Sequence, residues 1–170
     1  LNADSDKSPV VQLAECCIRR FKGELYLTKI FQDVSAWQQT IDSDFIAHKT
    51  PFNLNLPDEI GVLSFSTRSE EGGSVINWQG LIKKPTENQV VNIRFAHDNP
   101  ICLPQYRQHS RSLKKVLQEL SIPPWQRRRS PFIFYDNELV AVAGRFICKG
   151  YLAESVEAGF VITFDSEPSL

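Results

Sequence analysis

Residues 110–125 read SRSLKKVLQELSIPPW and hold the one clearly helical pattern of the chain. Four apolar residues recur there at the spacing of a single helix face: Leu113, Val116, Leu117 and Leu120. Ser110 is placed to cap the start, and Pro123-Pro124 prevents any continuation. The pattern predicts an amphipathic helix over residues 110–120.

Short extended runs surround this helix. Upstream, residues 10–21 and 24–31 predict a hairpin with Lys22-Gly23 at its turn, and residues 34–39 suggest one helical turn capped by Ser35. The other predicted strands are 50–55, 61–67, 75–82, 90–95, 132–135, 139–143, 145–148 and 160–164. The expected fold class is α+β, with mainly short antiparallel strands and one principal helix.

The expected organisation has three parts. Residues 1–8 are polar and read as a disordered or added segment, residues 9–88 as a β-rich hairpin region, and residues 89–165 as a C-terminal domain. The chain has 170 residues, no methionine and a leucine at position 1, which favours a fragment of a longer protein. Without an apolar run long enough to span a bilayer, a cytoplasmic protein is expected.

Charge is unevenly distributed along the chain. The net charge is −1, yet seven of the 19 basic residues lie between positions 105 and 130, where Glu119 is the only acid. These basic residues are Arg107, Arg111, Lys114, Lys115, Arg127, Arg128 and Arg129. Helical spacing would crowd Arg111 against Lys114 and Lys115, and such repulsion favours a polyanionic partner. Arginine also suits phosphate, because its planar guanidinium donates two hydrogen bonds at once.

A purely structural interpretation of the same stretch stays open. The cations would then form a solvated helix face and a basic loop. The proline pair would stiffen that loop, and Trp125 would fill the core beneath it rather than stack on a base. We interpret Pro123, Pro124 and Trp125 as structural support for the arginines.

Four segments together resemble the C-terminal domain of bacterial tRNA(Ile)-lysidine synthetases. They are residues 110–119 (SRSLKKVLQE), 122–127 (IPPWQR), 131–135 (PFIFY) and 139–144 (LVAVAG). This family has an Arg-x-Leu-Lys-Lys helix, a Pro-Pro-Trp-x-Arg turn and a Pro-apolar-Tyr strand in this order. A weaker likeness reaches upstream to Ile18-Arg19-Arg20-Phe21 and Leu25-Tyr26-Leu27.

The resemblance carries several implications. Such enzymes convert the anticodon wobble cytidine of a minor tRNA(Ile) to lysidine, using ATP with Mg and lysine in a catalytic domain that this chain lacks. The C-terminal domain is implied to have a three-layer β/β/α fold and to help discriminate tRNA at the acceptor stem. The implied partners are tRNA(Ile) and the N-terminal catalytic domain of the same protein, and oligomerisation is possible.

The matching positions make Arg111, Lys114, Lys115 and Arg127 candidate tRNA contacts. Arg128 departs from the family, which often has an acid there, so Arg107, Arg128 and Arg129 are candidates by charge alone. No catalytic residue is expected, because the family's Ser-Gly-Gly-x-Asp-Ser loop is absent and Glu71-Gly72-Gly73-Ser74 reads as a flexible loop.

The sequence holds no pattern typical of a metal site. The three histidines and four cysteines lack ligand spacing, so no metal is expected and the cysteines read as reduced thiols. His97-Asp98-Asn99-Pro100 reads as a turn with local side-chain hydrogen bonds. A protein-interaction or scaffolding domain without RNA contact is the alternative function, and an independent small enzyme is the third.

Overall fold

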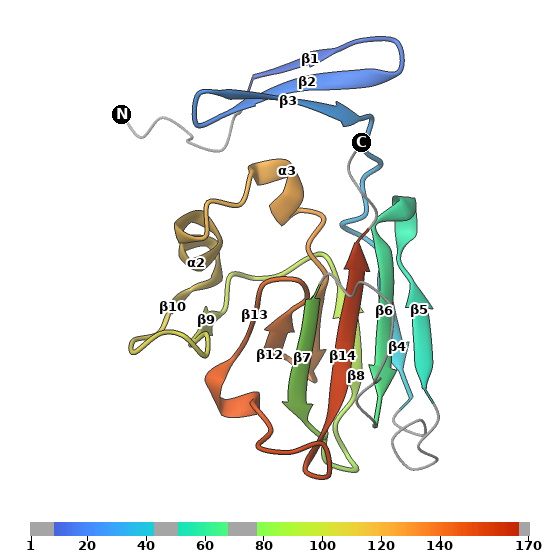
Figure 1. Ribbon diagram of the computed structural model, residues 1–170, viewed down its shortest axis with the longest axis vertical. Coiled ribbons are helices and arrows are strands. Elements are labelled where there is room, and N and C mark those ends of the chain that lie inside the picture. Colours follow the sequence, from blue (N-terminus) through green and yellow to red (C-terminus); the bar gives the residue numbers. More distant parts are fainter. Residues whose placement is uncertain (1–8, 43–50, 68–77, 167–170) are drawn as a thin grey trace.

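The computed structural model describes residues 9–42, 51–67 and 78–166. The tail at 1–8, the Gly72-Gly73 loop and the first residues of the strand expected at 75–82 lie outside this part of the chain. His48 lies outside it too. Two packed sheets form the body, two short helices lie at one side, and a three-stranded sheet lies at one end (Figure 1).

The first body sheet joins five antiparallel strands in the order β13-β12-β11-β8-β4. These strands are β4 (Gln38–Ile41), β8 (Val91–Arg94), β11 (Phe132–Tyr135), β12 (Glu138–Val142) and β13 (Phe146–Ile147). Asp136-Asn137 makes the turn between β11 and β12, as expected. The helical turn expected at 34–39 is wrong, because only Ser35 and Ala36 turn and the chain then extends into β4 beside β8.

The second body sheet joins four antiparallel strands in the order β5-β6-β14-β7. They are β5 (Phe52–Asn55), β6 (Gly61–Ser66), β7 (Trp78–Lys83) and β14 (Gly159–Ser166). The 3-10 turn η1 (Pro57–Glu59) links β5 to β6, and η2 (Lys149–Tyr151) follows β13. Strand β14 lies between two strands that come from before residue 88. Each body sheet therefore joins strands from both sides of the boundary drawn from the sequence at residue 88.

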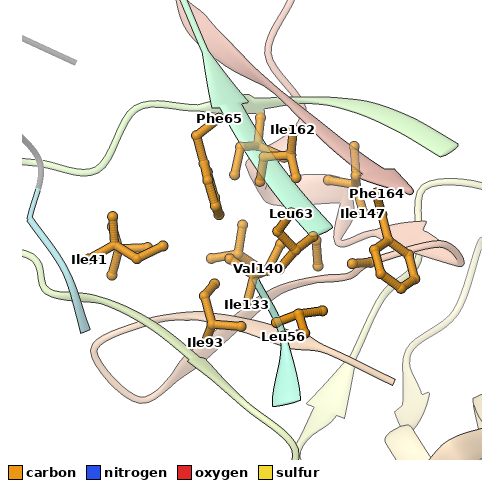
Figure 2. Packing of buried hydrophobic residues seen from close by; sticks show 14 of the residues in the cluster. Ile41, Leu56, Leu63, Phe65, Ile93, Ile133, Val140, Ile147, Ile162 and Phe164 are labelled. Atoms are coloured by element: carbon orange, nitrogen blue, oxygen red, sulfur yellow. The ribbon is translucent and has the colours of Figure 1, made fainter. Parts of the chain in front are cut away.

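The central strands of the five-stranded sheet are buried on both faces. All four residues of β11 are 1% exposed or less, so the strand reads as a continuous apolar run. Ile133 and Tyr135 point to the core between the sheets, whereas Phe132 and Phe134 point to a second core under the helices. Figure 2 shows the first core, where Leu63, Phe65 and Ile162 of one sheet meet Ile93, Ile133 and Val140 of the other.

Helix α2 (Leu113–Glu119) covers the outer face of the five-stranded sheet. Leu113, Val116 and Leu117 are at most 1% exposed and belong to the second core. The structure is thus α+β with sheet, sheet and helix layers, and the expected fold class is confirmed. The helix is shorter than expected, because Arg111-Ser112 forms strand β10, paired with β9 (Ile101–Cys102), and Leu120 ends the helix with 37% of its surface exposed.

The remaining sheet, in the order β1-β2-β3, confirms the predicted hairpin with Lys22-Gly23 at its turn. Its strands are β1 (Val10–Gln12), β2 (Cys16–Phe21) and β3 (Glu24–Lys29), so the expected first run is divided in two. One face of the sheet, with Arg19, Phe21 and Tyr26, is turned to helix α3 (Pro124–Arg127). The opposite face presents Val11, Ile18 and Leu27 side by side in register.

Candidate nucleic-acid interface

Helix α2 begins at a cap that comes from another part of the chain. The N-cap residue is Ser112, and its side chain makes no capping bond, so the capping role expected for Ser110 is wrong. Instead, the Lys114 N–H donates to Asn99 Oδ1 at 2.8 Å. Asn99 has a left-handed backbone with φ of 59°, a conformation that asparagine tolerates well. Residues 97–100 do not form the expected turn, and the Asn99 side chain instead fixes the start of the helix.

Helix α3 is anchored through Trp125, which is 7% exposed. Its ring makes edge contacts with Tyr26, at a centroid distance of 5.4 Å, and with Phe21, at 6.1 Å. The helix begins at Pro124, where the missing backbone N–H would have no partner anyway. The proline pair and Trp125 thus hold the segment that carries Arg127 and Arg128 against the hairpin sheet.

Between α2 and α3 lies a hollow of about 260 Å³, here called the helix hollow. Its polar lining comes from His97, Lys114, Gln118, Arg127 and Arg128. No acidic side chain of the described residues lines it. Lys114 reaches it from the first turn of α2, and Arg128 from the end of α3. Three cations therefore converge on one concave surface, the charge pattern suited to an anion.

Hydrogen bonds to backbone hold two of the lining side chains. Arg127 Nε donates to the carbonyl of Ile122 at 2.6 Å. Ile122 lies between α2 and α3, so this bond fixes the orientation of the guanidinium. The Asn99 N–H donates to His97 Nδ1 at 2.9 Å, so the imidazole accepts on that nitrogen and carries its proton on Nε2. Burial lowers the pKa of His97 below its ordinary value, and the neighbouring Lys114 lowers it further. His97 is therefore a neutral donor at pH 7.

The structure does not bring all seven predicted cations into one surface. Arg111 lies in β10 rather than on the helix, and its guanidinium pairs with Glu119 at 3.2 Å. Arg107 pairs with the same carboxylate, so Glu119 engages both arginines and its single charge offsets one of their two. The crowding expected between Arg111 and the two lysines is wrong, because the helix begins only at Leu113. Lys115 is exposed on α2 and does not line the helix hollow.

Arg129 interacts with other parts of the fold and is largely buried. Its side chain is 12% exposed and forms an ion pair with Asp58, which is 10% exposed. A second nitrogen of Arg129 donates to the Asp58 carbonyl at 2.8 Å, and the guanidinium lies 4.2 Å from the Phe31 ring centroid. Burial alone would raise the pKa of Asp58, but bonds from Arg129 and the Gln32 N–H lower it below its ordinary value. Arg129 thus connects α3 to η1 and to the segment after β3.

Asn99, His97 and Arg19 were not singled out as site residues by the sequence. Asn99 had a usable signal, since an Asx residue in a turn often satisfies orphan backbone groups. Arg19 lies on β2, where its Nε donates to Thr28 Oγ1 at 3.0 Å. In the described part of the chain, no three His, Cys, Asp or Glu side chains gather as a metal site would require. None of its helices is long and apolar enough to cross a bilayer.

Comparisons with known proteins agree on one family. Residues 91–164 match the family described as the TilS substrate C-terminal domain. The tRNA(Ile)-lysidine synthase of Vibrio vulnificus strain CMCP6 is 34% identical over 155 residues, which are 91% of this chain and 32% of the relative. The enzyme of the same name from Haemophilus influenzae strain PittEE is 32% identical over 145 residues, with 85% and 31% covered. The chain spans about a third of the length of these relatives.

A solved structure adds support for the fold alone. The crystal structure of a TILS C-terminal domain aligns with 71% of this chain and 100% of its own, with a TM-score of 0.50 and 14% identity. Two packed sheets and a covering helix thus make the fold of a C-terminal domain of the TilS kind. The chain belongs to the tRNA(Ile)-lysidine synthase family and carries its C-terminal domain.

Proposed function

We propose that this chain is a non-catalytic part of a tRNA(Ile)-lysidine synthase and that it binds tRNA phosphates through the helix hollow. One observation supports this most directly: Lys114 and Arg128 converge on a hollow that no acidic side chain of the described residues lines. Phosphate contacts from Lys and Arg supply most of the affinity in nucleic-acid binding and fix the register of the protein on its ligand.

The proposal divides the work of the whole enzyme between two parts. By family resemblance, the conversion of the wobble cytidine of tRNA(Ile) with ATP, Mg and lysine belongs to a catalytic portion outside this chain. The present chain would add further contacts to the same tRNA, in the cytoplasm where tRNA is modified. When one part of the enzyme is bound to the tRNA, the effective concentration of the other part near the tRNA rises. Weak binding by this chain therefore still increases the affinity of the whole enzyme for tRNA.

The test measures binding of a tRNA(Ile) transcript to this chain over a range of salt concentrations. With two phosphates neutralised, by Lys114 and Arg128, log K should fall with log salt at a slope near −2. Lys114→Gln should weaken binding and flatten that slope by about one unit. Lys115→Gln is the matched control, because it removes the same charge from the next residue of the helix, outside the hollow.

Two results would contradict the proposal. One is the absence of salt-dependent binding at low salt, and the other is an equal effect of Lys114→Gln and Lys115→Gln. The first result would favour the alternative of a protein-docking domain. That alternative has its own supporting observation in the outer face of the hairpin sheet, where Val11 and Leu27 are each 57% exposed and Leu25 is 73% exposed.

A further inference from the structure

A second, larger hollow lies beneath the hairpin sheet, and we call it the seam hollow. Its volume is about 930 Å³, within the range of about 300–1,000 Å³ typical of small-molecule sites. Val10 and Arg19 of the hairpin sheet form one wall, and Trp125 and Arg128 form the other. Residues 31–35, which follow β3, complete the lining. The hollow therefore exists only because the hairpin sheet packs beside α3.

Positive charge predominates in the seam hollow. Its lining includes Arg19, Arg128 and Arg129, against a single acid, Asp33. Arg129 is already neutralised by its ion pair with Asp58. Arg19 Nε donates to the neutral hydroxyl of Thr28, and this bond does not offset its charge. Arg128 is exposed. Arg19 and Arg128 together outweigh Asp33, so the hollow attracts an anionic group.

Aromatic rings hold the Arg19 guanidinium in a defined orientation. Its central carbon lies 5.1 Å from the ring centroid of Phe31 and 5.6 Å from that of Trp125. A guanidinium packed against rings keeps edge N–H groups for phosphate. Arg19 thus offers the phosphate contact that a nucleotide needs.

The seam hollow adjoins the helix hollow. Phe95, Pro124 and Arg128 line both of them. A strand whose phosphate contacts Arg128 can therefore extend from one hollow into the other. A base-paired nucleotide is held within its stack and cannot enter such a space, whereas an unpaired one can be turned out into it.

We infer that the seam hollow binds one unpaired nucleotide of RNA, with its phosphate on Arg128 and Arg19. The inference rests on the proposed tRNA binding and adds a second contact from the hairpin sheet. Arg19 lies outside residues 91–164, which match the family, so the RNA-binding surface extends beyond that domain.

Adjacent residues of β1 provide a matched test. Val10 lies directly opposite Arg19 in the sheet and lines the seam hollow, whereas Val11 points to the opposite face. The two side chains are 47% and 57% exposed, so neither substitution disturbs a core. Val10→Glu places a carboxylate beside Arg19. This carboxylate competes with the RNA phosphate for the guanidinium, so binding should weaken about tenfold. Val11→Glu makes the same charge change on the other face and should leave binding unchanged.

The probes are two RNA hairpins with one stem sequence, one blunt and one with a three-nucleotide single-stranded overhang. We expect the wild-type chain to prefer the overhang, Val10→Glu to abolish that preference, and Val11→Glu to retain it. Equal affinity for both RNAs, or equal effects of the two variants, would overturn the inference. If Lys114→Gln still weakens tRNA binding in that case, the helix hollow stands and only the seam hollow is refuted.

Discussion

At the scale of single residues, the arginines at 127–129 have three different roles although they are consecutive. Arg127 bonds the Ile122 carbonyl and lines the helix hollow, and Arg128 is exposed between the two hollows. Arg129 turns inward to Asp58. Arg127 ends helix α3, Arg128 is its C-cap and Arg129 lies in the turn beyond it, so the three side chains leave the backbone in different directions. Charge counted along the sequence therefore overestimates the charge available to a ligand.

The inward arginine leads to a prediction about stability. Arg129→Met should lower the free energy of unfolding by about 2–4 kcal/mol at pH 7, because it leaves a largely buried carboxylate without its cation. Arg128→Met is the matched control and should change stability little, since Arg128 is exposed. Urea unfolding of the two variants measures the difference. Equal stabilities would contradict a structural role for Arg129.

The same pair predicts a dependence on pH. The folded-state pKa of Asp58 lies below its ordinary value, so the pair stabilises the fold fully above about pH 4, the unfolded pKa of aspartate. The stabilisation is lost as pH falls through the lower folded pKa, because the protonated carboxyl no longer pairs with Arg129. The wild-type chain and Arg129→Met should therefore approach each other in stability in acid. A gap that stays constant with pH would exclude the ion pair as its source.

At the scale of elements, helix α2 is held at its start by a side chain outside it. The helix has only seven residues, too few to be stable alone in water, so the cap and the buried face sustain it. Asn99 supplies that cap and also bonds His97 through its backbone. The position of Lys114 in the helix hollow thus depends on a side chain that precedes the helix by more than ten residues.

Substitutions at Asn99 test this arrangement. Asn99→Gly keeps the left-handed backbone accessible but removes the capping oxygen, and it should cost about 1 kcal/mol. Asn99→Asp retains an oxygen acceptor at the helix start and should stay near wild type, with its charge favoured by the helix dipole. Thermal unfolding monitored by circular dichroism compares the variants. A loss in Asn99→Asp as large as that in Asn99→Gly would rule out the cap.

At the scale of the whole molecule, the two body sheets are interlocked by strands distant in sequence. Strand β14 pairs with β6 and β7, and β4 pairs with β8. The core between the sheets draws on both halves of the chain. Residues on either side of position 88 therefore depend on each other for burial.

This interlocking predicts a single cooperative unfolding transition for the body. Far-ultraviolet and near-ultraviolet circular dichroism should lose their signals at the same temperature, because neither half retains a complete sheet when the other melts. A chain ending at residue 158 lacks β14 and should fail to fold, since β6 and β7 would lose their shared partner. Two separated transitions, or a folded truncated chain, would show that the halves are independent.

The sequence predicted those features of the fold that depend on neighbouring residues. The apolar stripe of α2, the Lys22-Gly23 turn, strand β11 and the α+β class all follow from periodicity and turn chemistry, which depend on near neighbours. Strand β4 was missed, because its Gln38–Ile41 sequence carries little strand signal and it is held by pairing with β8. Such pairing depends on residues far away in the chain.

The sequence by itself determined most of the elements, the family and the presence of a concentrated basic segment. Only the tertiary structure decided which of those cations meet at a hollow and which are neutralised. The physical reason is that an ion pair depends on distance in space: Asp58 lies 71 residues from Arg129, and Glu119 collects two arginines from outside its helix. Packing of the hairpin sheet beside α3 likewise brings Arg19 to the same surface as Arg128.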